Sequence, residues 1–298
     1  KEEEFPLEAI KKAGDLGFCS LYVDTDLGGM GLGRLDASIV FEQLASGCTS
    51  TTAFLTIHNM AIWMVSKFGS EELKSEWFPV LSSGSKLASY CLTEPNSGSD
   101  VVSMSLHAEK QGNKTYLLNG TKMWITNGPD ADVLIIYAKT DPSAGSKGIT
   151  AFIVEKNMIG FSVGKKIDKL GMRGSNTSEL IFDNCEVPED NILGNPGDGA
   201  SILMSGLDFE RVVLAAGPLG IMASALDIVI PYTQERKQFG KSIGQFQLIQ
   251  GKIADMYTTL NACLSLIHIS EPTRLLSMGG GGVWVEKKWG GGGGGGGG

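Results

Sequence analysis

The stretch at 114–128 reads KTYLLNGTKMWITNG, and it marks a change in the hydrophobic pattern of the 298-residue chain. Its β-branched and aromatic residues stand between Asn and Gly turn signals, a pattern that is typical of short strands. Three stretches downstream share this pattern: DVLIIYAKT at 132–140, GITAFIVEK at 148–156 and SELIFDNCEV at 178–187. Together they predict a small antiparallel barrel or sandwich that begins at about Ser89.

Helical spacing surrounds this sheet region on both sides. From Pro6 to about Ser85, apolar residues recur every three to four positions, in segments that end at Gly, Pro or Ser. The same spacing returns after Gly199. We therefore predict an α+β chain of three domains, listed in order: an N-terminal helical domain at 1–88, a middle antiparallel β-barrel domain at 89–197 and a truncated C-terminal helical bundle at 198–263.

The tail at 264–298 differs in kind from the rest of the chain. It contains LSLIHISEPTR, which looks like the translation of a sequencing-library adaptor, and it ends in nine consecutive glycines. A glycine run has no side chains whose burial could offset its backbone entropy. The sequence therefore predicts an artefactual disordered tail, and a genuine flexible tail is the alternative.

Composition excludes several classes of function. The chain has 25 basic and 33 acidic residues, a net charge of −8, and no basic run that could follow nucleic acid. No apolar stretch reaches the roughly 18 residues of a membrane span, so no transmembrane segment is expected. Five scattered cysteines and three histidines lack the spacing of metal ligands. These features predict an acidic intracellular protein without a metal site.

One carboxylate in the second helical region stands out. In SILMSGLDFERVVLAAGPLG at 201–220, a rotation of about 100° per residue places Glu210 on the same helix face as Leu203, Leu207 and Leu214. A carboxylate that faces a core is costly unless it is paired or protonated. Glu210 therefore either pairs with a cation on a neighbouring helix or acts as a base in an apolar pocket, and this segment alone favours the pair.

Two further stretches suggest a ligand. In YCLTEPNSGSD at 90–100, the small residues Ser97, Gly98 and Ser99 would let backbone amides approach an anionic or planar group, although such runs are usually turns. In KMWITNG at 122–128, the indole of Trp124 and the hydroxyl of Thr126 could flank a flat ring.

With RKQFG at 236–240 and GQFQLIQ at 244–250, these stretches resemble, in their order, the acyl-CoA dehydrogenases, a flavoprotein family. The resemblance spans about residues 5–263. It implies FAD as cofactor, an acyl-CoA substrate, electron-transfer flavoprotein as electron acceptor, and a homo-oligomer, usually a tetramer. The family's eukaryotic members work in the mitochondrial matrix, and a bacterial member would be cytoplasmic.

The resemblance also assigns site residues. Those that match cofactor-binding positions are Tyr90, Cys91, Leu92, Thr93, Gly98, Ser99, Trp124, Ile125, Thr126, Arg236 and Gln247. The last two match residues that reach the FAD of a neighbouring subunit. Those that match positions near the substrate are Ser99, Ser146, Lys147, Asp208, Phe209 and Arg211.

In the isovaleryl-CoA dehydrogenase branch of this family, the helix that carries GLDxER supplies the base, and GLDFER places Glu210 at that position. The implied reaction is the FAD-dependent conversion of isovaleryl-CoA to 3-methylcrotonyl-CoA in leucine breakdown. Burial would raise the pKa of such a base towards that of the activated α-proton. The alternatives are an isobutyryl- or other short-chain acyl-CoA dehydrogenase, an acyl-CoA oxidase, and a non-catalytic truncated fragment that lacks the closing helices.

The resemblance is uneven along the chain. From about Val101 onward it is strongest to the isovaleryl branch, whereas the part before Asp100 is more similar to the isobutyryl branch. This pattern predicts either a chimera joined near Asp100 or a divergent member of the family.

Overall fold

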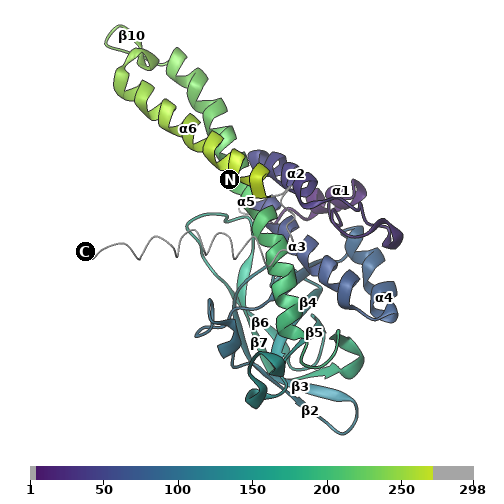
Figure 1. Ribbon diagram of the computed structural model, residues 1–298. Helices are drawn as coiled ribbons and strands as arrows, with labels where there is room; N and C mark the ends of the chain where they lie inside the picture. Colours follow the sequence, from purple (N-terminus) through teal and green to yellow (C-terminus); the bar gives the residue numbers. More distant parts are fainter. Residues whose placement is uncertain (1–4, 271–298) are drawn as a thin grey trace, which may run out of the picture. The chain divides into compact units, whose positions relative to one another are not determined.

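Helices, strands and helices follow one another along the chain, as the sequence predicts. The computed structural model describes residues 5–270 (Figure 1). The chain divides into two compact units, one formed by Lys1–Gly33 and Ser50–Leu207, the other by Arg34–Thr49 and Asp208–Gly298. The α+β class is confirmed, while the domain bounds at 88, 197 and 263 stay predictions.

Three helices belong mainly to the first unit, and local sequence explains their ends. They are α1 at Leu7–Asp15, α3 at Thr49–Phe68 and α4 at Glu71–Ser82. Helix α4 begins after Ser70, whose hydroxyl accepts a hydrogen bond from the amide of Leu73 at 3.3 Å. Two Glu residues in its first turn complement the helix dipole.

The strands form one mixed sheet in the order β6-β7-β3-β2-β4-β5-β8, with β1 beside β4. Its pairs are antiparallel, except that β1 and β2 each run parallel to β4. The strands are β1 at Ala88–Cys91, β2 at His107–Lys110, β3 at Thr115–Thr126, β4 at Val133–Lys139, β5 at Ile149–Glu155, β6 at Phe161–Lys166, β7 at Thr177–Pro188 and β8 at Ile192–Leu193.

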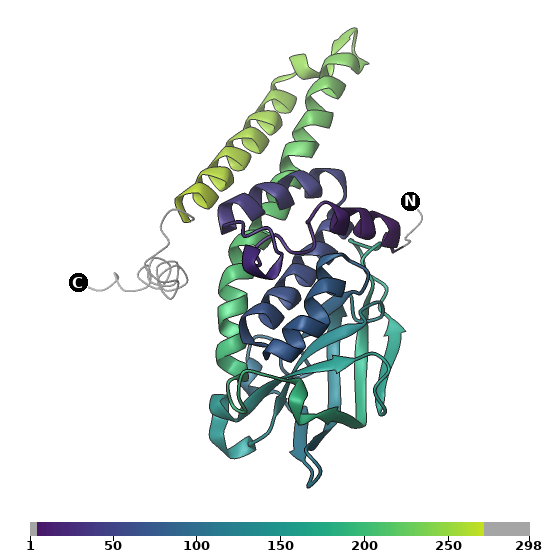
Figure 2. The same cartoon turned by 90° about the vertical axis from the view of Figure 1, so that its right-hand side faces the viewer.

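The sheet has a hydrophobic core on each face, which explains why β4 and β5 are apolar at almost every position. Alternate residues of β4, beginning with Val133 and Ile135, contact buried residues of α3 and α4. The residues between them, beginning with Leu134 and Ile136, contact the second core, which includes Phe152 and Leu180. Figure 2 shows α3 and α4 against the strands.

His58 of α3 joins that helix to the sheet. Its ring is fully buried, its Nε2 lies 2.9 Å from the carbonyl oxygen of Leu81, and its Nδ1 lies 3.0 Å from the amide of Ala88. An amide can only donate, so Nδ1 is the acceptor and the neutral ring carries its proton on Nε2. His58 is therefore a structural residue, as its lack of partners at metal-ligand spacing in the sequence indicates.

Acid is expected to destabilise the fold through His58. Burial lowers its pKa from 6.5 to about 4, against a smaller opposing effect of the Leu81 carbonyl. The pKa of His58 is lower in the folded chain than in the unfolded chain. The free energy of unfolding therefore has its full value above pH 6.5 and falls as the pH is lowered towards 4, because the unfolded chain takes up the proton first. The loss should be about 3 kcal/mol, and urea unfolding at several pH values measures it.

The matched variants are His58→Gln and His107→Gln, because His107 is exposed on β2. We expect His107→Gln to keep the acid dependence and His58→Gln to lose the part between these two pKa values. If the free energy of unfolding depends on pH in the same way in the two variants, this account of His58 is wrong.

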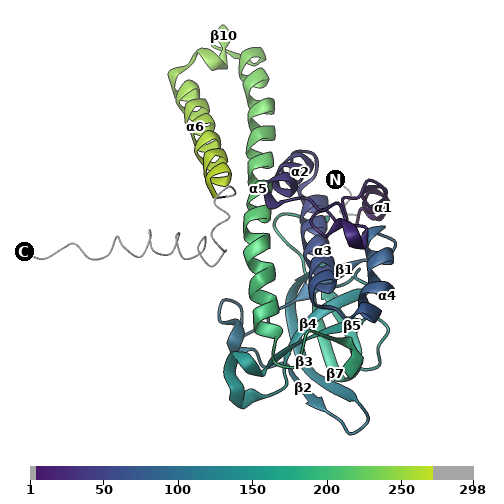
Figure 3. The same ribbon diagram turned by 45° about the vertical axis from the view of Figure 1, so that its right-hand side comes forward.

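The second unit consists of helices and a short hairpin. Helix α2 spans Arg34–Gly47, and α5, at Gly199–Glu235, begins in the first unit and continues through the second. The hairpin of β9 at Lys237–Gln238 and β10 at Lys241–Ser242 leads through η5 at Ile243–Gln245 to α6 at Gln247–Ser270. Figure 3 shows α6 beside the end of α5. The helix thus continues past position 263, and residues 271–298 of the predicted tail lie outside the described residues.

By length and composition, α5 could cross a membrane. It contains an 18-residue window with a mean hydropathy of 2.0. The sequence predicted no transmembrane segment, whereas this helix is long and apolar enough to form one. Core helices of soluble proteins can be equally long and apolar, so the absence of a transmembrane segment stays a prediction.

Two glycines of α5, one turn apart, should respond differently to alanine. A Cβ at Gly220 would lie 2.1 Å from the carbonyl oxygen of Glu42 in α2, whereas a Cβ at Gly217 meets nothing within 4 Å outside its chain neighbours. We expect Gly220→Ala to lower the free energy of unfolding by about 1–3 kcal/mol, through overpacking. Gly217→Ala should change it by less than about 1 kcal/mol, because the helix preference of alanine is opposed by contact of its Cβ with the ring of Pro218.

Thermal and urea unfolding of the two variants measure these changes. If Gly220→Ala loses no more stability than Gly217→Ala, the close contact between α2 and α5 is wrong.

Candidate functional site

The loop that follows β1 is a tight turn with an open outer side. The amide of Glu94 donates to the carbonyl of Ser97 at 2.9 Å, and the reverse bond measures 3.2 Å. The Ser97 hydroxyl donates to the carbonyl of Asp100 at 2.5 Å. Gly98 and Ser99 are exposed, and the nearest atom to a Cβ at Gly98 would be Thr93 Cγ2 at 3.9 Å. The small residues therefore leave space beside the loop.

Trp124 is held outward by an irregularity in β3. The pairing of β3 with β7 shifts between Lys122 and Ile125, as in a β-bulge. Trp124 has φ of 57°, in the left-handed region that bulky residues rarely adopt, and its side chain is 53% exposed. Ile125 is buried, and Thr126 resumes the ladder opposite Thr177. An exposed indole at a strained backbone position is a feature of binding sites.

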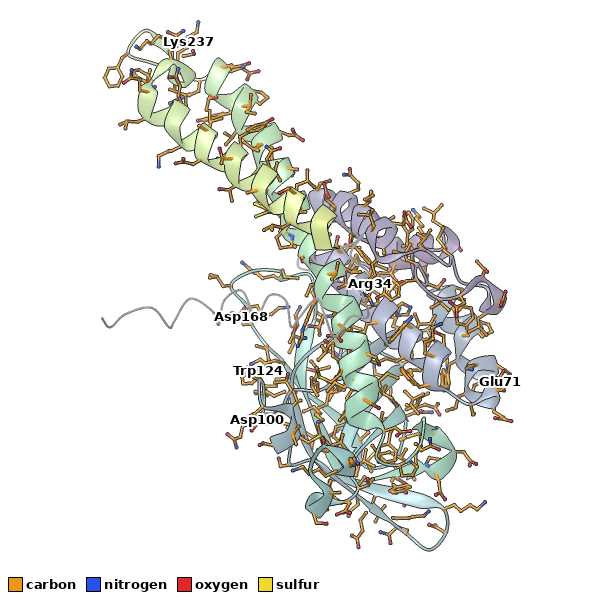
Figure 4. All side chains as sticks on the ribbon, in the orientation of Figure 1. Arg34, Glu71, Asp100, Trp124, Asp168 and Lys237 are labelled. Carbon is orange, nitrogen blue, oxygen red and sulfur yellow. The ribbon has the colours of Figure 1, made fainter. Side chains whose placement is uncertain are left out.

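The loop and this strand meet, as the two predicted ligand segments require. The amide of Met123 donates to the carbonyl of Thr93 at 2.8 Å, and the hydroxyl of Ser89 donates to the carbonyl of Thr126 at 2.6 Å. Figure 4 shows Trp124 and Asp100 on the same side of the strand layer. Together, the loop at 90–100 and the segment at 122–126 form what we call the cradle.

The cradle offers a flat ligand an exposed aromatic face and a loop of small residues. Of its predicted members, Tyr90, Leu92 and Thr93 are partly buried. Cys91 is fully buried, and burial raises the pKa of its thiol, which suits a packing residue rather than a nucleophile. Ser146 and Lys147 are exposed in η3 at Pro142–Gly148, and no described hydrogen bond joins them to the cradle.

Glu210 is buried in α5, as both interpretations of the sequence require. Its side chain is 4% exposed, and Val213 and Ala216 of the same helix are also buried. Leu214, which the helix-face count placed beside Glu210, is 46% exposed, so the buried face turns towards Val213. That part of the prediction is wrong, because a fixed rotation of 100° cannot locate the edge of a buried stripe.

Unlike Glu210, the neighbouring residue Arg211 is not buried. Arg211 is exposed and its Nη1 lies 3.5 Å from Oδ1 of Asp208, one turn earlier. The charge of Arg211 therefore has a partner on its own helix. The side chain of Phe209 lies outside the described part of the structure, so its predicted role at the substrate stays a prediction.

Arg236 and Gln247 lie at the hairpin end of the second unit. Arg236 follows α5 directly, its carbonyl accepts a hydrogen bond from the amide of Ile243 at 2.8 Å, and Gln247 begins α6. Both side chains are exposed. Their predicted contact with the FAD of a neighbouring subunit stays a prediction.

A buried ion pair joins the two segments of the cradle, and neither of its residues is among those predicted from the sequence. Lys122 Nζ lies 2.9 Å from Oε1 of Glu94, and the two side chains are 0% and 2% exposed. The period-2 pattern of β3, with Tyr116 and Leu118 buried, places Lys122 on the inner face and could have revealed it. Burial lowers the pKa of the Lys122 ammonium, although Glu94 opposes this.

Glu94 is held as a carboxylate by several donors. Burial alone would raise its pKa, but the charge of Lys122 and hydrogen bonds from the Ser105 amide and hydroxyl outweigh it and lower the pKa. The Ser105 amide and hydroxyl donate to Oε2 at 2.6 and 2.7 Å, and the Leu106 amide donates to Oε1 at 3.0 Å. The pair is thus fully hydrogen-bonded, as a buried ion pair must be.

We also looked in the described residues for a metal site and for a cavity near the cradle. Within residues 5–270, no group of three or more His, Cys, Asp or Glu side chains could hold a metal ion. A cavity of about 230 Å³ is lined by Lys166, Ile167, Asp168, Lys169 and Arg173. None of the predicted site residues belongs to this lining.

Comparison with known proteins places most of this chain in one family. Sequence models of the acyl-CoA dehydrogenase N-terminal, middle and C-terminal domains match residues 1–85, 89–185 and 197–269. The chain is 53% identical over 264 residues to the mitochondrial isovaleryl-CoA dehydrogenase of Pongo abelii, covering 88% of this chain and 62% of that protein. It is 45% identical over 268 residues to the mitochondrial isobutyryl-CoA dehydrogenase of Dictyostelium discoideum, covering 90% and 64%.

Solved structures agree with these matches. Butyryl-CoA dehydrogenase from Megasphaera elsdenii has a TM-score of 0.87 at 37% identity, over 92% of this chain and 72% of that one. The FAD complex of PigA has a TM-score of 0.87 at 35% identity, over 91% and 72%. The chain spans 62% and 64% of the lengths of the two curated relatives named above.

Proposed function

The chain belongs to the acyl-CoA dehydrogenase family, and we propose on this premise that it oxidises isovaleryl-CoA to 3-methylcrotonyl-CoA with FAD as cofactor. The observation that carries the proposal is the buried carboxylate of Glu210 within GLDFER. The identity to isovaleryl-CoA dehydrogenase, 53% against 45% to isobutyryl-CoA dehydrogenase, favours isovaleryl-CoA over isobutyryl-CoA.

Glu210 would remove the proton. Its carboxylate accepts the proton from the carbon next to the thioester carbonyl, and the carboxylic acid forms as the C–H bond breaks. Its side chain is 4% exposed, and a carboxylate held out of solvent is the kind of group that this step requires. FAD, when bound, supplies the acceptor for the hydride that leaves the adjacent carbon.

The cradle would hold the flavin. Gly98 has no side chain, so a ligand could approach the backbone of the loop closely there. The strand presents the exposed indole of Trp124. Amides and hydroxyls around Thr93 and Thr126 would give polar contacts to a ring with oxygen and nitrogen atoms. The similar structure of PigA is an FAD complex, which supports this assignment.

The proposal extends to partners and place. Electron-transfer flavoprotein would take the electrons, and Arg236 and Gln247, exposed at the hairpin end, would reach the FAD of a second copy in a homo-oligomer. The mitochondrial matrix is the proposed location, since the two curated relatives are both mitochondrial proteins. The substrate-facing roles of Ser99, Ser146, Lys147, Asp208, Phe209 and Arg211 are part of the same proposal.

Anaerobic mixing of the purified protein with isovaleryl-CoA tests the proposal. We expect bound flavin to lose its visible absorbance, faster with isovaleryl-CoA than with isobutyryl-CoA, and to regain it with electron-transfer flavoprotein. Faster bleaching by isobutyryl-CoA would reassign the substrate, and rapid recovery in air would indicate an oxidase. A colourless protein that binds no added FAD would mean that this chain is a non-catalytic fragment.

A further inference from the structure

The buried ion pair of Lys122 and Glu94 takes no part in the proposed chemistry, and it lies where the two segments of the cradle join. We propose that this pair is the positioning element of the cradle, which holds Trp124 in its left-handed, outward conformation. The inference rests on the proposed function, because it concerns the segments that would hold FAD.

The pair is costly, which argues for a specific role. Taking two charges out of water can cost more than their attraction returns, and apolar side chains of similar volume often serve stability equally well. Here both side chains are at most 2% exposed. Polar networks of this kind can fix one conformation among several that a purely apolar contact would allow.

The hydrogen bonds of the pair show which backbone segments it holds together. Lys122 Nζ donates to the Leu92 carbonyl at 3.0 Å and to Glu94 Oε1 at 2.9 Å. The next strand residue, Met123, donates its amide to the Thr93 carbonyl at 2.8 Å. Three consecutive loop residues are therefore held by two consecutive strand residues.

The position held in this way is strained. Trp124 immediately follows these two strand residues and has φ of 57°. A bulky residue keeps such a conformation only when its surroundings over-determine it. Glu94 also accepts hydrogen bonds from Ser105 at Oε2, the oxygen that does not contact Lys122, and from the Leu106 amide at Oε1, so the anchor is itself fixed. Without Lys122, the strand could relax towards ordinary β pairing and turn the indole away.

The experiment uses the protein labelled with 5-fluorotryptophan and examined by ¹⁹F NMR without FAD. Trp124→Phe assigns the Trp124 resonance, and Trp63 in α3 and Trp77 in α4 serve as internal references. The test variants are Lys122→Met and the milder Glu94→Gln. Lys110→Met is the matched control, since Lys110 forms an exposed ion pair with Glu189.

We expect the Trp124 resonance to move or broaden in the two test variants, while those of Trp63 and Trp77 stay in place. The dissociation constant of FAD should rise about tenfold to a hundredfold in the same variants, because the ligand contacts are misplaced. Lys110→Met should change neither quantity.

The inference is overturned if a folded test variant keeps the Trp124 resonance and an FAD dissociation constant within about twofold of the unaltered protein. It is also overturned if neither test variant folds, because the pair would then serve folding alone. If the unaltered protein binds no FAD, the proposed function fails, and the ¹⁹F spectra still decide whether the pair positions Trp124.

Discussion

Glu210→Gln is expected to slow the reduction of bound flavin by isovaleryl-CoA by about a hundredfold to ten-thousandfold. The amide keeps the size of the side chain in its buried position but cannot accept the proton. Binding of the thioester should change much less than the rate. Stopped-flow absorbance under anaerobic conditions measures the rate, and its dependence on substrate concentration separates rate from affinity.

Asp227→Asn is the matched control, because Asp227 is an exposed carboxylate on the same helix. We expect its rate to equal that of the unaltered protein. If Glu210→Gln stays within about threefold of the unaltered rate while the protein is folded, Glu210 is a structural residue, as the ion-pair interpretation holds.

Gly98→Val should weaken FAD binding by about tenfold or more, which corresponds to about 1.4 kcal/mol. The folded chain leaves room for a Cβ at this exposed position, with the nearest atom at 3.9 Å, so little cost to stability is expected. A branched side chain would instead occupy the space that the ligand needs. Titration of the protein with FAD, followed by flavin fluorescence, measures the loss.

Gly112→Val provides the comparison, because a Cβ at Gly112 meets nothing within 4 Å, so this position has room as well. It should leave FAD affinity unchanged. Equal affinities for the two variants would mean that the ligand does not approach Gly98, and a large fall in the urea midpoint of Gly98→Val alone would mean that the loop is tighter than described.

The sequence predicted those features that depend on local periodicity. The strand character of β4 and β5 followed from their β-branched residues, and Glu210 was placed on a buried helix face because apolar residues recur at helical spacing around it. The cradle was anticipated through its small residues and its Trp, and its two segments are in contact. Family resemblance supplied the roles.

What the sequence did not predict depends on contacts between distant residues. The pair of Lys122 and Glu94 is separated by 28 positions, and only the fold of the loop brings it together. The parallel pairing of β1 with β4 also arises between segments far apart in the chain. The exposure of Leu214 depends on which part of the helix face is covered, which periodicity alone cannot give.

The most direct test of the account is the exchange of the α-hydrogens of acetyl-CoA with deuterium oxide, catalysed by the FAD-bound protein. Acetyl-CoA has no β-carbon, so only the proton-removal step assigned to Glu210 can occur. We predict that the unaltered protein incorporates deuterium, observed by mass spectrometry, and that Glu210→Gln loses this exchange. Equal incorporation by the two proteins would contradict the assignment of Glu210 as the base.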